Sequence, residues 1–456
     1  MNTRSPLLLA GLDSPLPERA SMLARLGRKL LLAQLRQFEH GELRLVEPDG
    51  QEHVFGRRHA GFDVGCTLRF EHPQVFADAA FGGTVGAGEA YIRGLWRCDD
   101  LVALVRIFVA NREQMNRMDS RWAFVSRPLL RLFHWANRNS RHGSARNIAA
   151  HYDLGNDLYK LMLDDTMAYS CAIFPHADST LAEGSEAKFE AVCRKLDLKP
   201  TDHVLEIGTG WGGFAIHAVR RYGCRVTTTT ISAAQRDLAV RKIAELGLSD
   251  RITVLLEDYR DLGRDLTADA TGPYDKLVSI EMVEAVGAPF LDGYFKQCSR
   301  LLKPNGAMLL QAITIRDQFY EQALKSVDYI QRYVFPGSFI PSVQALSASL
   351  AKATDLKIFH LEDIGPHYAR TLRLWRERFF RNLAAVRELG YSDSFIRLWE
   401  YYLCYCEGGF MERQLGTVQM LLTKPECRRA PFESTALSSP GERPSLHLTT
   451  PERAAR

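Results

Sequence analysis

The chain of 456 residues contains no run of eighteen apolar residues, which is about the length that a helix needs to cross a bilayer. The apolar stretch at residues 7–10 is also too short to form the core of a signal peptide. These two absences argue against a membrane-spanning protein and against export. We therefore expect the protein to be cytoplasmic.

Cysteine is scarce and shows no regular spacing: the nine cysteines stand at positions 66, 98, 171, 193, 224, 298, 404, 406 and 427. An odd number without a pattern argues against a disulfide framework and favours reduced thiols. Cys404 and Cys406 are separated by one residue, and no cluster of His or Cys lies near them in the sequence. A zinc site is built from several such ligands, so we expect no metal.

Acidic residues are absent between Asp119 and Asp153. The gap holds aromatic and leucine residues together with six arginines, which are Arg121, Arg127, Arg131, Arg138, Arg141 and Arg146. This mixture is typical of a segment in the headgroup region of an anionic bilayer, although it also occurs in nucleic-acid-binding segments and in solvated basic linkers. We define residues 119–150 as the basic aromatic linker. We predict peripheral association with the inner face of the membrane, with a phospholipid surface and not nucleic acid as partner.

The regions on either side of this linker differ in pattern. Residues 1–118 predict a small, lipid-binding-like α+β domain, with an amphipathic helix at 19–38, a hairpin at 41–55, a strand at 67–70 and helices near 88–91 and 101–112. Residues 151–427 predict strands at 203–207, 225–230, 252–256, 276–281 and 307–313, helices at 212–222, 233–246 and 289–302, and a turn at 303–306. Aromatic-rich helices follow residue 315, and the tail at 428–456 is predicted to be disordered.

The most informative motif is an apolar strand that runs into Gly208, Gly210 and Gly212. Glycines at this spacing let the main chain turn sharply and approach a ligand where a Cβ would collide. A nicotinamide site more usually shows Gly-x-Gly-x-x-Gly and an acidic residue about twenty positions later. Here the second strand ends in Thr230 without a carboxylate. The motif therefore favours S-adenosylmethionine (SAM) over a dinucleotide or a purely structural turn.

Strands that alternate with helices indicate a parallel sheet covered on both faces, with the ligand crevice at the carboxyl ends of the strands. We predict an α/β fold of the class I SAM-dependent methyltransferase (Rossmann-like) type with a helical lid. The small N-terminal α+β domain is attached to it.

Eight ordered blocks closely resemble the cyclopropane-fatty-acyl-phospholipid synthase family. They are HYDLGNDLY (151–159), AYSCA (168–172), EIGTGWGG (206–213), TISAAQ (230–235), DYRD (258–261), EMVEAVG (281–287), YVFPG (333–337) and YLCYCEGGF (402–410). The stretch GEAYIRGLW (88–96) also matches, so the likeness covers roughly residues 40–424. The resemblance implies an enzyme that transfers a methylene from SAM to the double bond of an unsaturated acyl chain in membrane phospholipid. We also expect a homodimer.

The resemblance assigns most of the block residues to SAM. The predicted cofactor-binding residues are Tyr169, Ser170, Glu206, Gly208, Thr209, Gly210, Trp211, Gly212, Gly213, Thr230, Ile231, Ser232, Gln235, Asp258, Tyr259 and Arg260. Glu206 is expected to take the ammonium group, and Thr230 with Gln235 to replace the missing ribose carboxylate. Tyr169 and Ser170 resemble the family's lid over the methionine.

Attack on the methyl group leaves a carbocation on the acyl chain, which aromatic faces stabilise without offering a nucleophile. Candidates for this role are Tyr169, Trp211, Tyr329, Tyr333, Phe335 and Tyr368. The resemblance implies that a bicarbonate ion removes the proton, and by block position its ligands are Cys171, Glu284, Gln311, the main-chain amide of Ile313, and Tyr368. Cys406 stands where the family is sometimes assigned an active-site cysteine. Since no His beside Cys406 lowers its pKa, the alternative is a small buried apolar side chain.

Two positions depart from the family pattern, because Ala285 and Gln311 stand where many relatives have histidine. Glutamine can donate a hydrogen bond to an anion but cannot shuttle a proton. An alternative product is therefore a 10-methyl or methylene branched chain, made with a reductase partner. Two further hypotheses are a SAM-dependent methyltransferase for a small amine or hydroxyl compound and a non-enzymatic lipid carrier with the same fold.

Overall fold

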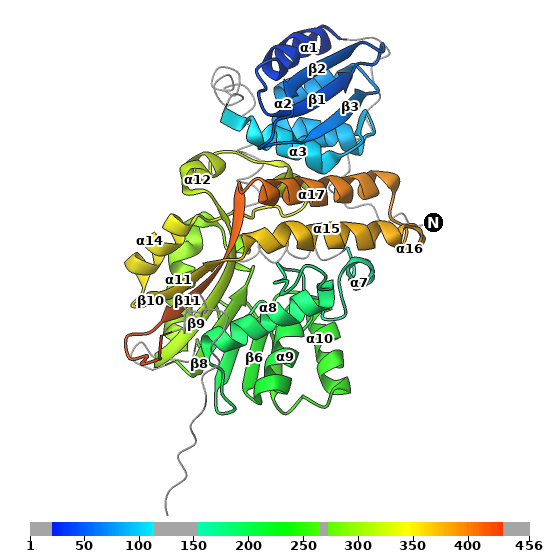
Figure 1. Cartoon of the computed structure of the whole chain (residues 1–456). Helices are drawn as coiled ribbons and strands as arrows, with labels where there is room; N and C mark the ends of the chain where they lie inside the picture. Colours follow the sequence, from blue (N-terminus) through cyan, green and yellow to red (C-terminus); the bar gives the residue numbers. More distant parts are fainter. Residues whose placement is uncertain (1–20, 114–153, 265–271, 432–456) are drawn as a thin grey trace, which may run out of the picture.

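The computed structural model describes residues 21–113, 154–264 and 272–431 (Figure 1). The basic aromatic linker at 119–150 and the tail from residue 432 lie outside them, and the predictions made for these segments stay predictions. Two sheets are present, one of four strands and one of seven. In the described part of the chain, no helix combines the length and the apolar character that crossing a membrane requires.

The four-stranded sheet belongs to the N-terminal domain and has the order β2-β1-β3-β4. Its elements are α1 (Met22–Leu35), β1 (Gly41–Val46), β2 (Glu52–Arg57), β3 (Gly65–Phe70), α2 (Gln74–Ile92), β4 (Trp96–Cys98) and α3 (Leu101–Ala110). The predicted hairpin is β1 with β2, paired antiparallel, and β1 also pairs with β3 in parallel. Helix α2 is longer than expected because Gly83, at φ 57° and ψ −141°, kinks it without ending it.

The seven-stranded sheet has the order β10-β11-β9-β8-β5-β6-β7. Its parallel part is built from α7 (Asn156–Met162), α8 (Leu181–Leu196), β5 (His203–Ile207), α9 (Gly213–Tyr222), β6 (Arg225–Thr230), α10 (Ala233–Glu245), β7 (Ile252–Leu256), β8 (Tyr274–Ile280), α11 (Leu291–Leu301) and β9 (Leu302–Ile315). One hydrophobic cluster packs α8, α9 and α10 against the sheet, and another packs α11 and the C-terminal α14 (Val343–Ala353). The predicted α/β architecture is confirmed.

Two details of the sheet correct the prediction. The sheet is not wholly parallel, because β11 (Leu415–Thr423) inserts antiparallel between β9 and β10 (Lys357–Asp363). Most of β11 is buried on both faces, so it lacks the alternation that marks a half-exposed strand. The turn expected at 303–306 lies inside β9, where the pairing with β8 shifts its register between Tyr274 and Lys276.

The remaining helices after residue 315 are α12 (Asp317–Ala323), α13 (Tyr329–Tyr333), α15 (Gly365–Arg381), α16 (Leu383–Glu388) and α17 (Asp393–Met411). Helices α15 and α17 lie between the large sheet and the N-terminal domain (Figure 1). Helix α17 contacts α2 and α3, and hydrogen bonds join the two domains: Tyr91 Oη donates to Glu400 (2.7 Å) and Arg106 Nε to Glu412 (2.6 Å). A single hydrophobic cluster therefore runs through both domains.

Candidate functional site

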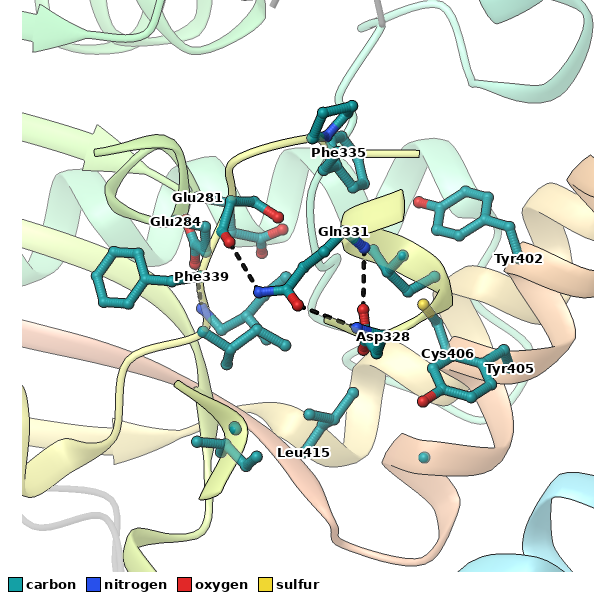
Figure 2. Close-up of a pocket in the computed structure, with 18 of the residues that line it drawn as sticks. Glu281, Glu284, Asp328, Gln331, Phe335, Phe339, Tyr402, Tyr405, Cys406 and Leu415 are labelled. Carbon is teal, nitrogen blue, oxygen red and sulfur yellow. Dashed lines mark hydrogen bonds between the residues drawn. The ribbon is translucent and has the colours of Figure 1, made fainter. Parts of the chain in front are cut away.

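A cavity of about 1270 Å³ begins at the carboxyl ends of β5, β6 and β8 and continues to the N-terminal domain. Part of its wall is drawn in Figure 2, with Glu281 and Glu284 on one side and Tyr402, Tyr405 and Cys406 of α17 on the other. Sites for one small ligand typically measure about 300–1,000 Å³. The cavity is therefore large enough for a cofactor together with a second molecule.

The glycine turn after β5 forms one end of this cavity. Gly208, Gly210 and Gly212 have φ values of 103°, 50° and 87°, which side chains with a Cβ rarely adopt. The amides of Gly208 and Thr209 both donate to the Thr229 carbonyl, at 3.0 and 3.1 Å, and hold the turn against β6. A Cβ on Gly210 would meet nothing within 4 Å, so the main chain there faces open space that a ligand can fill.

Two buried charged side chains stand beside the turn. Glu206 lines the cavity, and its Oε2 is buried with no hydrogen-bond partner among the described residues. Burial raises the pKa of Glu206 to about 8. Lys188 of α8 also lines the cavity, its Nζ donates to Ser170 Oγ at 2.7 Å, and burial lowers its pKa to about 8. A buried carboxyl group with one unpartnered oxygen, beside a bare main-chain turn, fits the cationic amino acid part of SAM.

The ends of β6 and β7 complete the cofactor side. Ser232 caps α10 by accepting from the Gln235 amide at 3.3 Å, and Thr230 Oγ1 donates to Gln235 Oε1 at 2.9 Å. Asp258 accepts two hydrogen bonds from the Arg260 guanidinium, at 2.8 and 2.5 Å. Ser232 therefore has a structural role as the cap of α10. Thr230, Gln235 and Asp258 line the cavity.

Most of the residues predicted to bind SAM line this one cavity. Those that line it are Tyr169, Ser170, Glu206, Gly208, Thr209, Gly210, Trp211, Gly213, Thr230, Ile231, Gln235, Asp258, Tyr259 and Arg260. Gly212 and Ser232 do not line it and instead precede α9 and α10 as their caps. Trp211 Nε1 donates to Asn156 Oδ1 at 2.8 Å, and the Tyr169 and Tyr402 hydroxyls lie 2.8 Å apart.

The residues assigned to an anion surround a carboxylate of the chain itself. Glu281 Oε1 accepts from the Cys171 amide at 2.9 Å and from Gln311 Nε2 at 2.8 Å. Glu281 Oε2 accepts from the Tyr368 hydroxyl at 2.6 Å. Cys171 and Gln311 are fully buried behind the cavity wall, whereas Tyr368 and Glu281 line it. Glu281 was absent from the predicted site, although the sequence placed it at the end of a predicted strand, where ligand-binding residues of this fold lie.

The orientation of Gln311 is fixed by a chain of amides. Lys195 Nζ donates to Gln419 Oε1 at 2.5 Å, so the amide nitrogen of Gln419 faces Gln311 and donates to its Oε1 at 2.9 Å. The amide nitrogen of Gln311 must then point to Glu281. The Gln311 side chain is therefore held as a donor toward a carboxylate.

Glu284 makes a separate contact next to this cluster. Its Oε1 accepts from the Ile313 amide at 2.5 Å, and its buried Oε2 has no partner among the described residues. Burial and then the neighbouring Glu281 charge raise the pKa of Glu284 to about 8. The polar donors that the resemblance assigned to bicarbonate are thus bonded to Glu281 or Glu284. They do not fit an additional anion.

The aromatic candidates divide into two groups. Tyr169, Trp211, Phe335 and Tyr368 line the cavity, and so do Tyr401, Tyr402 and Tyr405, which sequence reasoning missed. Tyr329 and Tyr333 do not line it. Tyr329 Oη donates to the Leu398 carbonyl at 3.1 Å and Tyr333 Oη donates to Glu89, so these two side chains stabilise the packing around α17 and the domain interface.

Cys406 lines the cavity opposite Glu281 and Glu284 (Figure 2). Burial, followed by the charge of Asp328, raises the pKa of the Cys406 thiol well above its usual value. The thiol therefore stays protonated at neutral pH, and nucleophilic attack requires the thiolate. The geometry favours Cys406 as part of the apolar wall.

The fold and the site together define a class I SAM-dependent methyltransferase. The chain belongs to the family described as mycolic acid cyclopropane synthetase, which matches residues 139–420. The tuberculostearic acid methyltransferase of Mycobacterium tuberculosis is 36% identical over 351 residues, which are 75% of this chain and 79% of that protein. The cyclopropane-fatty-acyl-phospholipid synthase of Escherichia coli K12 is 35% identical over 361 residues, 78% of this chain and 87% of that protein.

A solved structure of a mycolic acid cyclopropane synthase in complex with SAH and CTAB is also similar. It has a TM-score of 0.55 and 30% sequence identity, and the match covers 61% of this chain and 98% of that chain. SAM is therefore the cofactor, and the chain is a SAM-dependent methyltransferase of a family that acts on lipids. The names of the relatives include both ring-forming and methyl-branching enzymes.

Proposed function

We propose that the protein transfers a methylene from SAM to the double bond of an unsaturated acyl chain in membrane phospholipid and so forms a cyclopropane ring. The observation that supports this most is the large cavity, which joins the proposed cofactor end to an apolar end. The apolar end is lined by leucine, valine and aromatic side chains of both domains, among them Leu35, Val85, Phe108, Ile330, Tyr401 and Phe410.

At the cofactor end, SAM supplies an electrophilic methyl group when it is bound. Glu206 would hold the ammonium group, and the glycine turn would let the main chain approach the amino acid part. Thr230 and Gln235 would hold the ribose, and Tyr259 would contact the adenine. Tyr169 and Ser170 would cover the methionine and keep water away from the methyl group.

An isolated alkene is a weak nucleophile, so it must be aligned with the methyl group in a dry pocket. The apolar walls exclude water, and the aromatic faces of Tyr169, Phe335 and Tyr402 stabilise the carbocation that forms. These contacts favour an acyl chain over a small amine or hydroxyl compound as substrate. Heat released on calorimetric titration with SAM would separate the enzyme from a lipid carrier, which should give none.

We infer that the cavity opens where apolar side chains of its lining are accessible to solvent. Leu23, Leu26 and Leu324 line the cavity and are 61%, 41% and 37% exposed. Exposed apolar groups around a cavity opening are typical of a surface that meets a partner or a membrane. We propose that this opening faces the inner leaflet, so that an acyl chain passes from the bilayer into the cavity.

The basic aromatic linker is proposed to strengthen this association. Replacing Arg127, Arg131 and Arg138 together by Ser should weaken cosedimentation with anionic vesicles, and the difference from wild type should be larger at low ionic strength, where the attraction is least screened. Unchanged cosedimentation at every salt concentration would show that the segment is only a linker. A homodimer and a reductase partner stay predictions.

A branched product is the second candidate, favoured by Gln311 and by the tuberculostearic acid methyltransferase among the relatives. Both outcomes begin with the same methyl transfer. Analysis of lipids from a heterologous host that expresses the chain tests activity and product together. We expect acyl chains with one additional carbon and a ring; a methylene branch or a saturated methyl branch within the chain would favour the second candidate, and unchanged lipids would contradict both.

A further inference from the structure

Glu281 is held in a strained position at the end of β8. Its φ of 49° lies in the left-handed region, which costs a residue with a Cβ about 1–2 kcal/mol. A Cβ on Gly208 would lie 3.4 Å from Met282, the residue after Glu281. Glu281 therefore lies between the end of β8 and Met282, which packs against the glycine turn. The Glu281 side chain lines the cavity.

Burial raises the pKa of Glu281, and hydrogen-bond donors oppose this shift by stabilising the carboxylate. The Cys171 amide, Gln311 Nε2 and the Tyr368 hydroxyl all donate to it, and such donors favour the ionised form of a carboxylate. The buried cation Lys188 interacts electrostatically with Glu281 and with Glu206. Donors from three separate segments thus fix one negative group at the cavity wall.

We propose that Glu281 is the catalytic base of this enzyme and removes the proton that an external anion would otherwise have to accept. This inference rests on the proposed function. It extends that function by naming a proton acceptor that belongs to the chain.

The step balances as follows. The π pair of the alkene forms a bond to the methyl carbon, while the methyl–sulfur bond breaks and its pair stays on sulfur. The other alkene carbon becomes cationic. Glu281 then takes a proton from the added methyl group, and the C–H pair closes the ring by bonding to the cationic carbon. The protonated Glu281 returns its proton to solvent when the product leaves.

Glu281 suits this role better than its neighbour Glu284. Both oxygens of Glu281 accept hydrogen bonds, whereas Glu284 accepts one from the Ile313 amide and keeps a buried oxygen without a partner in the described structure. Two adjacent buried carboxyl groups do not both ionise easily. Glu281, which accepts more hydrogen bonds, carries the charge, and Glu284 carries the proton.

The first test compares Glu281→Gln with wild type, using SAM and vesicles of monounsaturated phosphatidylglycerol. We expect turnover to fall by roughly 10²–10⁴-fold, the range for loss of a general base, while SAM affinity stays within about twofold. Glu407→Gln is the matched control, because Glu407 of α17 is also buried but pairs with Arg376 of α15 and does not line the cavity. It should keep wild-type turnover.

Two further measurements separate a base from a structural group. With SAM that carries a trideuterated methyl, the isotope effect on turnover should rise in Glu281→Gln, because proton removal becomes the slow step. Glu281→Gly relieves the strained φ and empties the place of the carboxylate, so added formate should restore part of its turnover. Wild-type turnover should not change when bicarbonate is removed from the buffer.

The results distinguish this inference from the proposed function. If wild type adds no carbon to the lipid, the proposed function fails. Two results would show that Glu281 is not the base while the proposed function stands. One is a wild type that is active only with added bicarbonate. The other is turnover within about threefold of wild type for Glu281→Gln, or for Glu281→Gly in the absence of formate.

Discussion

A methyl group added at Gly210 should weaken SAM binding much more than it weakens folding. Gly210 has a φ of 50°, lines the cavity, and offers open space to a Cβ. Gly247, at the end of α10, has a φ of 67° and equally open space, but it does not line the cavity. The two substitutions to Ala therefore introduce the same backbone strain, of about 1–2 kcal/mol, and only one of them intrudes on the cofactor.

The size of the binding effect follows from overpacking. A methylene forced into a well-packed space costs about 1–3 kcal/mol, which corresponds to roughly 5- to 150-fold in affinity. We expect Gly210→Ala to lose SAM affinity by that factor in calorimetric titration and Gly247→Ala to bind like wild type. Denaturant unfolding should show similar destabilisation in both variants. Equal SAM affinity in the two variants would refute the placement of the cofactor on this turn.

Three further predictions concern single side chains. Since the pKa of Glu206 is raised to about 8, about nine in ten molecules carry a protonated Glu206 at pH 7. SAM binding should release this proton, so the binding enthalpy should depend on the buffer in wild type and not in Glu206→Gln. A buffer-independent enthalpy in wild type would contradict this prediction. Glu284→Gln should leave SAM affinity unchanged and keep turnover near wild type at pH 7, because Gln imitates the protonated form; a deficit of about tenfold, or ~1.4 kcal/mol, should develop as pH rises through about 8, the pKa of Glu284, and full activity at every pH would exclude a role for its charge. Cys406→Ala should keep turnover within about threefold because the thiol is not ionised, and a loss comparable to that of Glu281→Gln would restore Cys406 as a reactive group.

Elements with a clear periodicity were predictable from the sequence. The strands from β5 to β8 and the helices α9, α10 and α11 stand close to the expected ranges, because each pairs an apolar pattern with a glycine or polar boundary. Strand β11 was missed because it carries Gln419 and Thr417 in a buried position, and their polar side chains hide the pattern. The length of α2 was missed because Gly83 interrupts it.

The sequence also indicated residues that line one end of the cavity, since those predicted to bind SAM lie in short contiguous blocks. The Glu281 cluster was not, because its donors come from residues 171, 311 and 368, which only the fold brings together. Lys188 left a signal, since it stands on the same helical face as Leu181 and Val192, where a lysine is unexpected. The contribution of the N-terminal domain to the cavity depends on how α2 and α3 pack against α17, which no local pattern encodes.

The most direct test of the central claim uses purified protein, SAM labelled with ¹³C in its methyl group, and vesicles of monounsaturated phospholipid. The account predicts that the labelled carbon appears in the acyl chain, at the former double bond, with one S-adenosylhomocysteine formed per carbon transferred. Unlabelled lipid with SAM intact, or label found only on the headgroup, would contradict it.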